Sequence, residues 1–310
     1  ALEAMGRVAA AVFDVAGNPG YSQRVLQWAP DIATHDPGSA GGVLGLDFHL
    51  TVDGPQLIEV NTNPGGLLLN AVLLDGVRSC APAAWTTWTT ATEAHSAAVA
   101  AWLDDARQQS GRAPSRVAIV DSAPREQFLY PEFELYADAF QEHGVDCVIR
   151  APEELSLGPD GLADAHGRID MVYNRLTDFA LEEASHADLR QAYLAGDVAF
   201  TPHPRAHALF ADKRNLAVLG DPTLIGGFGV DAGSAALLAQ VIDVFHTEGG
   251  RAAALREAAA RAGSWPCLRR TPGRGRRPRR RSWCTCSTMS SRWCSCRSRR
   301  PGDRAVSTSS

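Results

Sequence analysis

Apolar residues recur along the chain in two patterns, one typical of buried strands and one typical of helices. Short apolar runs predict strands at three places, 116–122, 145–150 and 169–175, and "DVAFTP" at 197–202 follows the last predicted helix of this region. Longer segments with apolar residues at helical spacing predict helices at three places: 85–109, 131–143 and 181–193. Strands and helices that alternate in this way form a parallel α/β sheet, which we expect across residues 115–200.

An antiparallel hairpin is predicted earlier in the chain, within "GLDFHLTVDGPQLIEVNTNPGG" at 45–66. Asp-Gly-Pro at 53–55 is a turn sequence between two alternating runs. With these three residues in the loop, His49 faces Glu59 and Asp47 faces Asn61, so the four side chains share one face. A two-residue loop would shift the register and place Asp47 on the opposite face from Glu59 and Asn61.

The polar face of this hairpin has two interpretations. The oxygens of Asp47, Glu59 and Asn61 suit a hard cation such as Mg²⁺, which binds one or two carboxylates and completes its shell with water and substrate phosphates. The same alternation is also the normal pattern of a half-exposed antiparallel sheet. His49 reads as an ordinary strand histidine, and "NTNPGG" reads as a turn whose free amides could lie beside a phosphate.

Charge is unevenly distributed along the chain. Residues 264–310 hold 13 of the 30 basic residues but only Asp303 of the 35 acidic ones, so this tail carries +12 and the remainder −17. The tail could be a basic nucleic-acid arm, or its C-x-C pairs could bind a metal. Its Arg, Ser, Cys, Trp and Pro composition is what GC-rich coding DNA yields out of frame, so we interpret 264–310 as frameshifted and disordered. Nucleic-acid binding is therefore not expected.

The rest of the chain has the composition of a cytoplasmic protein. Cys80 and Cys147 are its only cysteines, too few and too far apart for a disulfide framework. No run of about 18 apolar residues and no signal pattern occurs, so no membrane partner is expected.

The hairpin motif resembles that of ATP-grasp ligases, specifically the circularly permuted branch that includes glutathionylspermidine synthetases. In that branch an Arg-x-Asp strand precedes a Glu-x-Asn strand, which places Asp47, Glu59 and Asn61 on the metal-binding positions and Gly45 on the arginine position. The order of motifs is also similar, because an α/β segment follows and then "HALFADKRNLAVL". Lys213 in that segment matches the first ATP-contacting lysine of the family. The resemblance covers about residues 5–220.

Two basic residues outside the hairpin are candidates for ligand contacts. Lys213 is the only lysine in the chain, and a compact ammonium is a common phosphate ligand, although a surface residue at a helix start would look the same. Arg175 ends a predicted strand where open α/β sheets place their ligands, and could bind a substrate carboxylate or a phosphate. The alternative for Arg175 is an ion pair with Asp178. His203, Arg205 and His207 read mainly as packing around the lysine.

The residue patterns and the resemblance together predict four segments in an ATP-grasp-like α/β fold: a metal-hairpin segment with its following helix (1–110), a parallel, pre-ATP-grasp-like subdomain (115–200), the lysine step with a helical segment, expected to be incomplete (201–263), and the tail (264–310). It implies an ATP- and Mg²⁺-dependent ligase that joins a small-molecule carboxylate to an amine through an acylphosphate. The family's second lysine and glycine-rich flap have no match, so we expect an incomplete ligase. A non-catalytic nucleotide- or small-ligand-binding protein stays the alternative.

Overall fold

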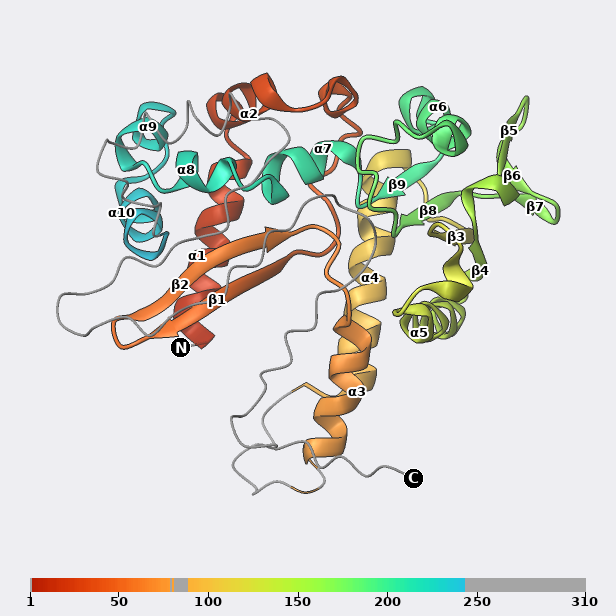
Figure 1. Cartoon of the computed structure of the whole chain (residues 1–310), viewed down its shortest axis with the longest axis horizontal. Helices are drawn as coiled ribbons and strands as arrows, with labels where there is room; N and C mark the ends of the chain where they lie inside the picture. The colour runs from red at the N-terminus through yellow and green to blue at the C-terminus, as the bar shows by residue number, and fades with distance from the viewer. Residues whose placement is uncertain (1, 79, 81–88, 243–310) are drawn as a thin grey trace, which may run out of the picture. The chain divides into compact units, whose positions relative to one another are not determined.

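The computed structural model describes residues 2–78, 80 and 89–242, which belong to a compact unit, Ala1–Ser264 (Figure 1). The predictions for the tail at 264–310 and for the first residues of the helix at 85–109 lie outside the described residues. No helix in the described ranges is long and apolar enough to cross a membrane.

The N-terminal part of the chain supplies a hairpin and the helices around it. Its elements are α1 (Leu2–Ala16), α2 (Pro19–Val25), η1 (Leu26–Trp28), η2 (Asp31–Thr34), β1 (Gly45–Thr51), β2 (Gly54–Asn61), α3 (Leu67–Arg78) and α4 (Ala91–Ser110). Helix α4 starts later than predicted, because Thr90 and Glu93 form a capping box at its first turn. Its end follows the sequence closely, since Gly111 adopts a left-handed conformation after Ser110.

A four-stranded parallel sheet confirms the α/β prediction. In spatial order its strands are β4 (Asp146–Arg150), β3 (Arg116–Val120), β8 (Met171–Asn174) and β9 (Ala199–Thr201). Helices α4 and α5 (Tyr130–Glu142) pack on one face, and α6 (Ala187–Ala195) packs on the other. The helix predicted over 181–193 begins six residues later than expected, after a 3₁₀ turn, η6 (Ala184–His186).

A small antiparallel sheet that was not predicted from the sequence is formed by the segment of chain that connects β4 to β8. It consists of β5 (Ser156–Gly158), β6 (Gly161–Asp164) and β7 (Gly167–Arg168). The buried carboxylate of Asp164 joins it to the parallel sheet, since it accepts hydrogen bonds from Arg116 at 2.7 Å and from Arg150 at 2.9 Å. Burial opposes ionisation of Asp164, but the two guanidinium groups and a backbone N–H hold its pKa below the usual range.

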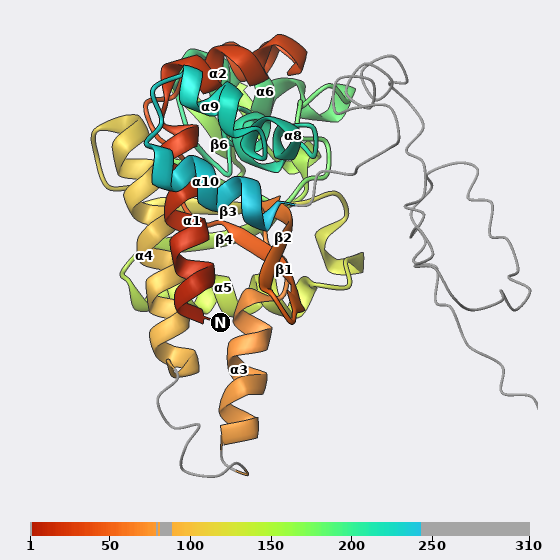
Figure 2. The ribbon, with the colours of Figure 1, turned by 90° about the vertical axis from the view of Figure 1, so that its left-hand side faces the viewer.

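The chain then returns to the hairpin through a series of short helices. These are α7 (Pro204–Ala206), the π-helix η7 (His207–Ala211), α8 (Asn215–Leu219), α9 (Pro222–Gly227) and α10 (Ala232–Val241). Helix α1 presents Val8, Val12 and Val15 on one face, and together with α10 it covers the apolar side of the hairpin, where Leu57 and Val60 are buried (Figure 2). The opposite side of the hairpin carries its polar residues.

Candidate functional site

The hairpin differs in register from the prediction, although its oxygen-bearing side chains still share one face. Its turn is the two-residue Val52–Asp53, not a three-residue loop at 53–55, so the predicted pairs of His49 with Glu59 and of Asp47 with Asn61 are wrong. His49 pairs with Gln56 instead. A β-bulge between Asp47 and Phe48 leaves Ile58 as an extra residue on β2, and Asp47 then pairs directly with Glu59.

The bulge explains why the three oxygen-bearing side chains share a face despite the short turn. Leu57 and Val60 are both buried although they lie three positions apart, which a regular strand would not allow. Glu59 therefore points away from the core, on the same side as Asp47. Asn61 follows Glu59 by two positions, and its Nδ2 lies 3.5 Å from Oδ2 of Asp47.

Lys213 reaches the same cluster from a distant part of the chain. Its Nζ lies 2.7 Å from Oε2 of Glu59, with the lysine side chain 54% and the glutamate side chain 29% exposed. The hydrogen bond and charge of Lys213 lower the pKa of Glu59, with a smaller contribution from Asn61. The structure thus brings together four of the five residues singled out from the sequence: Asp47, Glu59, Asn61 and Lys213.

The donor set of this cluster fits a divalent cation. Two carboxylates and an amide oxygen are hard ligands on one partly exposed strand face, which leaves room for water and substrate oxygens. Among the described residues, a geometric group of Asp178, Glu183 and His186 could also contact a cation. In that group Asp178 already accepts hydrogen bonds from the Glu183 backbone and His186, both of which support the turn η6.

Arg175 lies elsewhere and does not form the ion pair considered for it. Asp178 contacts His186 at 2.8 Å instead. The guanidinium of Arg175 is buried against Phe133 and Tyr173, and it donates to the Tyr173 hydroxyl and to the side chain of Asn63. Asn63 belongs to the loop that follows Asn61, so Arg175 connects the exit of the hairpin to the parallel sheet.

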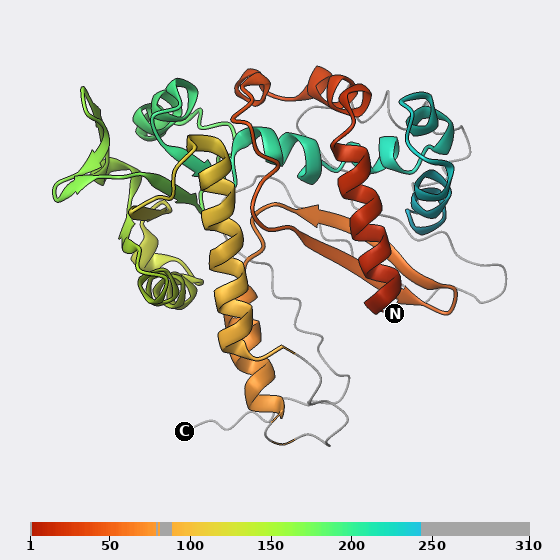
Figure 3. The ribbon, with the colours of Figure 1, turned by 180° about the vertical axis from the view of Figure 1, so that it is seen from behind.

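Glu132 holds the same loop from α5 and was missed in the sequence. Its carboxylate is fully buried and accepts hydrogen bonds from Gly66 N at 2.8 Å and Leu68 N at 2.9 Å, at the start of α3. Figure 3 shows α3 running beside α4 below this point. The charge of Glu132 also stabilises the buried Arg175 cation, whose pKa is raised by Tyr173 and Glu132 although burial opposes it.

Asp121 was also missed, although the sequence carried a signal for it. It follows β3 directly, and Arg175 follows the neighbouring strand β8 in the same register, since Val120 pairs with Asn174. The chain goes from β3 to β4 on one side and returns to β8 on the other, so a topological switch point lies between β3 and β8. Burial raises the pKa of Asp121 to about 6, against the influence of the Ser122 N–H and Arg175. An acidic residue directly after a buried strand was the available signal.

The remaining basic side chains near the lysine have structural partners. Arg205 contacts Asp36 and the Ala33 carbonyl, so it faces the N-terminal segment and not the carboxylate cluster. His203 accepts from the Ala206 N–H at the start of α7. The ring of His207 stacks on Phe179 at 3.6 Å, and burial lowers its pKa to about 4.

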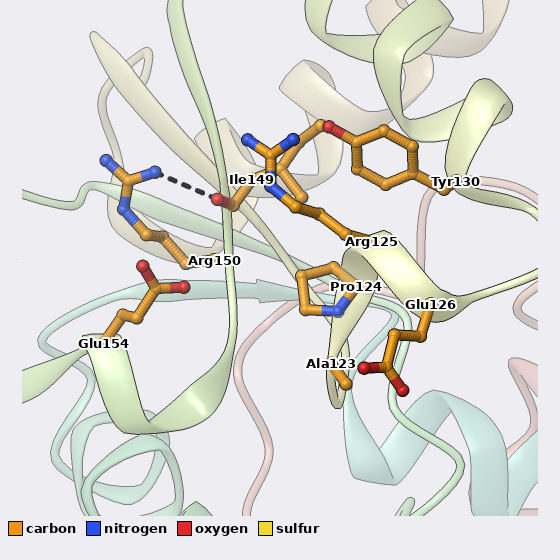
Figure 4. A pocket seen from close by; sticks show the side chains of 8 residues that line it. All are labelled: Ala123, Pro124, Arg125, Glu126, Tyr130, Ile149, Arg150 and Glu154. Atoms are coloured by element: carbon orange, nitrogen blue, oxygen red, sulfur yellow. Dashed lines mark hydrogen bonds between the residues drawn. The ribbon is translucent and has the colours of Figure 1, made fainter.

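A shallow pocket of about 350 Å³ opens at the carboxyl ends of β3 and β4 (Figure 4). Its charged lining includes Arg125, Arg150 and Glu154, and the guanidinium of Arg125 lies 5.6 Å from the ring of Tyr130. Arg150 is bound to Asp164 and to the Ile149 carbonyl. No residue of the hairpin lines this pocket, so it is separate from the carboxylate cluster.

The fold is shared with a protein named for glutathione synthetase. No family model and no curated protein matches the chain. Among solved structures, the fold is similar to that of a glutathione synthetase-like effector from Globodera pallida in its apo form, with a TM-score of 0.52 and 15% sequence identity. The match covers 78% of this chain and 60% of that structure. It shows a common mixed α/β fold, while the circular permutation expected from the order of motifs stays a prediction.

Proposed function

We propose that the chain is the metal- and nucleotide-binding part of an ATP-grasp-type ligase that joins a carboxylate to an amine. The observation that carries this proposal is the meeting of Lys213 with Glu59, because the two come from motifs far apart in the sequence that a single Mg-ATP site would need side by side. The fold shared with a glutathione synthetase-like protein supports the same reading.

Each residue has a defined role in this proposal. Asp47, Glu59 and Asn61 would hold Mg²⁺, which would supply positive charge to the phosphates during phosphoryl transfer. Lys213 adds a point charge to a phosphate. Arg175 is the candidate contact for an anionic group of the substrate, because it lies at the switch point of the parallel sheet, where ligands of α/β folds bind.

Binding of Mg-ATP without turnover is the second candidate. One observation favours it, namely that Gly45 occupies the position where the family has an arginine. That cation would act on the charge that develops in the transition state, and its loss would reduce catalysis more than binding.

Calorimetric titration of Mg-ATP tests the proposal. Lys213→Ala should weaken binding about tenfold to a hundredfold, since one charge-assisted contact is worth roughly 1.5 to 3 kcal/mol. Lys213→Arg should restore only part of the affinity, because a planar guanidinium does not replace a compact ammonium. Arg107→Ala, which removes an exposed cation on α4, is the control and should bind like wild type.

Equal affinities in wild type and both Lys213 variants would contradict the assigned site. No binding of Mg-ATP by the wild type would contradict nucleotide binding altogether. Measuring ATP turnover with a panel of amines and carboxylates then separates a ligase from a binding protein.

A further inference from the structure

The ammonium of Lys213 occupies a position that the proposed function also requires for a metal ion. Its Nζ lies 2.7 Å from Oε2 of Glu59, one of the three proposed metal ligands. Asp47 and Asn61 flank Glu59 on the same face of the hairpin. A divalent cation bound by these oxygens would therefore lie close to a positive charge that is already paired with one of them.

The neighbours of Lys213 in sequence are held by their own contacts, whereas the lysine side chain is more than half exposed. Asp212 and Arg214 are paired with each other, and Arg214 also donates to the Trp28 carbonyl and lies over the Trp28 ring. Among the described residues, Lys213 Nζ has no ion-pair partner besides Glu59. With the lysine side chain 54% exposed, this pair is a weak one that solvent and ions can replace at small cost.

We propose that Lys213 and a divalent cation alternate at the Glu59 carboxylate, so that metal binding releases the ammonium to contact the nucleotide phosphates. The inference rests on the proposed function and adds a coupling between metal binding and the contact of Lys213 with the nucleotide phosphates. Like charges repel at this distance, so a metal ion on Glu59 weakens the lysine pair, and the freed ammonium is attracted by the phosphates that the metal brings.

The exchange predicts effects of opposite sign for one substitution. Removing Lys213 removes a competitor for Glu59, so the free metal ion should bind more tightly. It also removes a phosphate contact, so Mg-ATP should bind less tightly. A lysine that only supported the fold of the hairpin would not strengthen metal binding when removed, and a lysine fixed on the phosphates would leave free metal binding unchanged.

The single lysine allows a direct measurement on the unmodified protein. The full chain produced with ¹³C-labelled lysine gives one lysine side-chain signal, from Lys213. The expected result is that its Cε–Hε signal shifts as Mg²⁺ is added and that Glu59→Gln shifts the signal of the metal-free protein in the same direction. Asp104→Asn removes an exposed carboxylate on α4 and should leave the signal in place.

A second experiment measures metal affinity, with Mn²⁺ as the probe and electron paramagnetic resonance as the readout. Lys213→Ala should bind free Mn²⁺ about two- to fivefold more tightly than wild type, which corresponds to roughly 0.4 to 1 kcal/mol for a partly exposed pair. The same variant should bind Mg-ATP at least about tenfold more weakly. The thermal midpoint of each variant shows that it is folded.

The outcomes separate this inference from the proposed function. If wild type binds Mg-ATP but the lysine signal does not move with Mg²⁺, or if Lys213→Ala binds Mn²⁺ no more tightly, the exchange is wrong and the nucleotide site stands. If the signal moves and Mn²⁺ binding tightens without any Mg-ATP binding, the exchange stands and the proposed function is wrong. If the wild type binds neither metal nor nucleotide, both are wrong.

Discussion

Glu132 should contribute more to stability than the exposed acidic residues of α5, because it is buried and holds the loop after the hairpin. Its two carboxylate oxygens accept from Gly66 N and Leu68 N at 2.8 and 2.9 Å. In Glu132→Gln one oxygen becomes an amide that donates, so one backbone N–H faces a donor and loses a charge-assisted bond worth roughly 1.5 to 3 kcal/mol. Arg175 also loses the negative charge that compensates it.

The expected loss for Glu132→Gln is about 3 kcal/mol of the free energy of unfolding. Urea titration followed by tryptophan fluorescence measures it, provided that the slope of the transition is the same in both proteins. Glu134→Gln is the matched control, since Glu134 lies on the same helix but is exposed, and it should cost less than about 0.5 kcal/mol. If the two variants lose the same stability, the buried carboxylate does not hold the loop as described.

One further substitution tests the switch point, and one deletion tests the bulge. Asp121 has a folded-state pKa raised by burial to about 6, so its contribution to stability is present below pH about 4, the unfolded pKa, and is lost as the pH rises through 6. At pH 7.5, Asp121→Asn should therefore raise the free energy of unfolding by roughly 1 to 2 kcal/mol in a urea titration, and at pH 4 it should show no gain. An equal gain at both pH values would contradict the raised pKa. Deletion of Ile58 removes the extra residue of the bulge but keeps the pair of Asp47 with Glu59. Mn²⁺ affinity should stay within about threefold of wild type, and a complete loss would show that the bulge itself shapes the site.

The parallel sheet could be predicted because its signals are local. The strand segments Val117–Val120 and Met171–Tyr173 are continuous apolar runs, as expected for strands buried on both faces. Helix α5 follows its apolar periodicity to within one residue at each end. The β5–β7 sheet was missed because its strands have only two to four residues, too short for a period to be recognised.

The candidate site was only partly predictable, since several of its contacts depend on tertiary structure. Asp47, Glu59 and Asn61 could be named from the motif, but their shared face was inferred from a register that does not occur. The ion pair of Lys213 with Glu59 joins residues that only the family resemblance relates, since no local periodicity or spacing pairs them. Glu132 looks like any polar residue of a helix surface in the sequence, and only the fold shows that it is buried.

The bulge in the hairpin also gives the spacing of its motif some freedom. Eleven residues separate Asp47 from Glu59, whereas in a regular ladder with the same two-residue turn ten residues would separate Asp47 from its partner. Loss of the bulged residue Ile58 can be absorbed, because the shorter hairpin is then the regular one with the same pairs. Related hairpins with either spacing can therefore present the same pair of carboxylates. A search pattern that demands one fixed interval between the aspartate and the glutamate would miss the hairpins that have the other spacing.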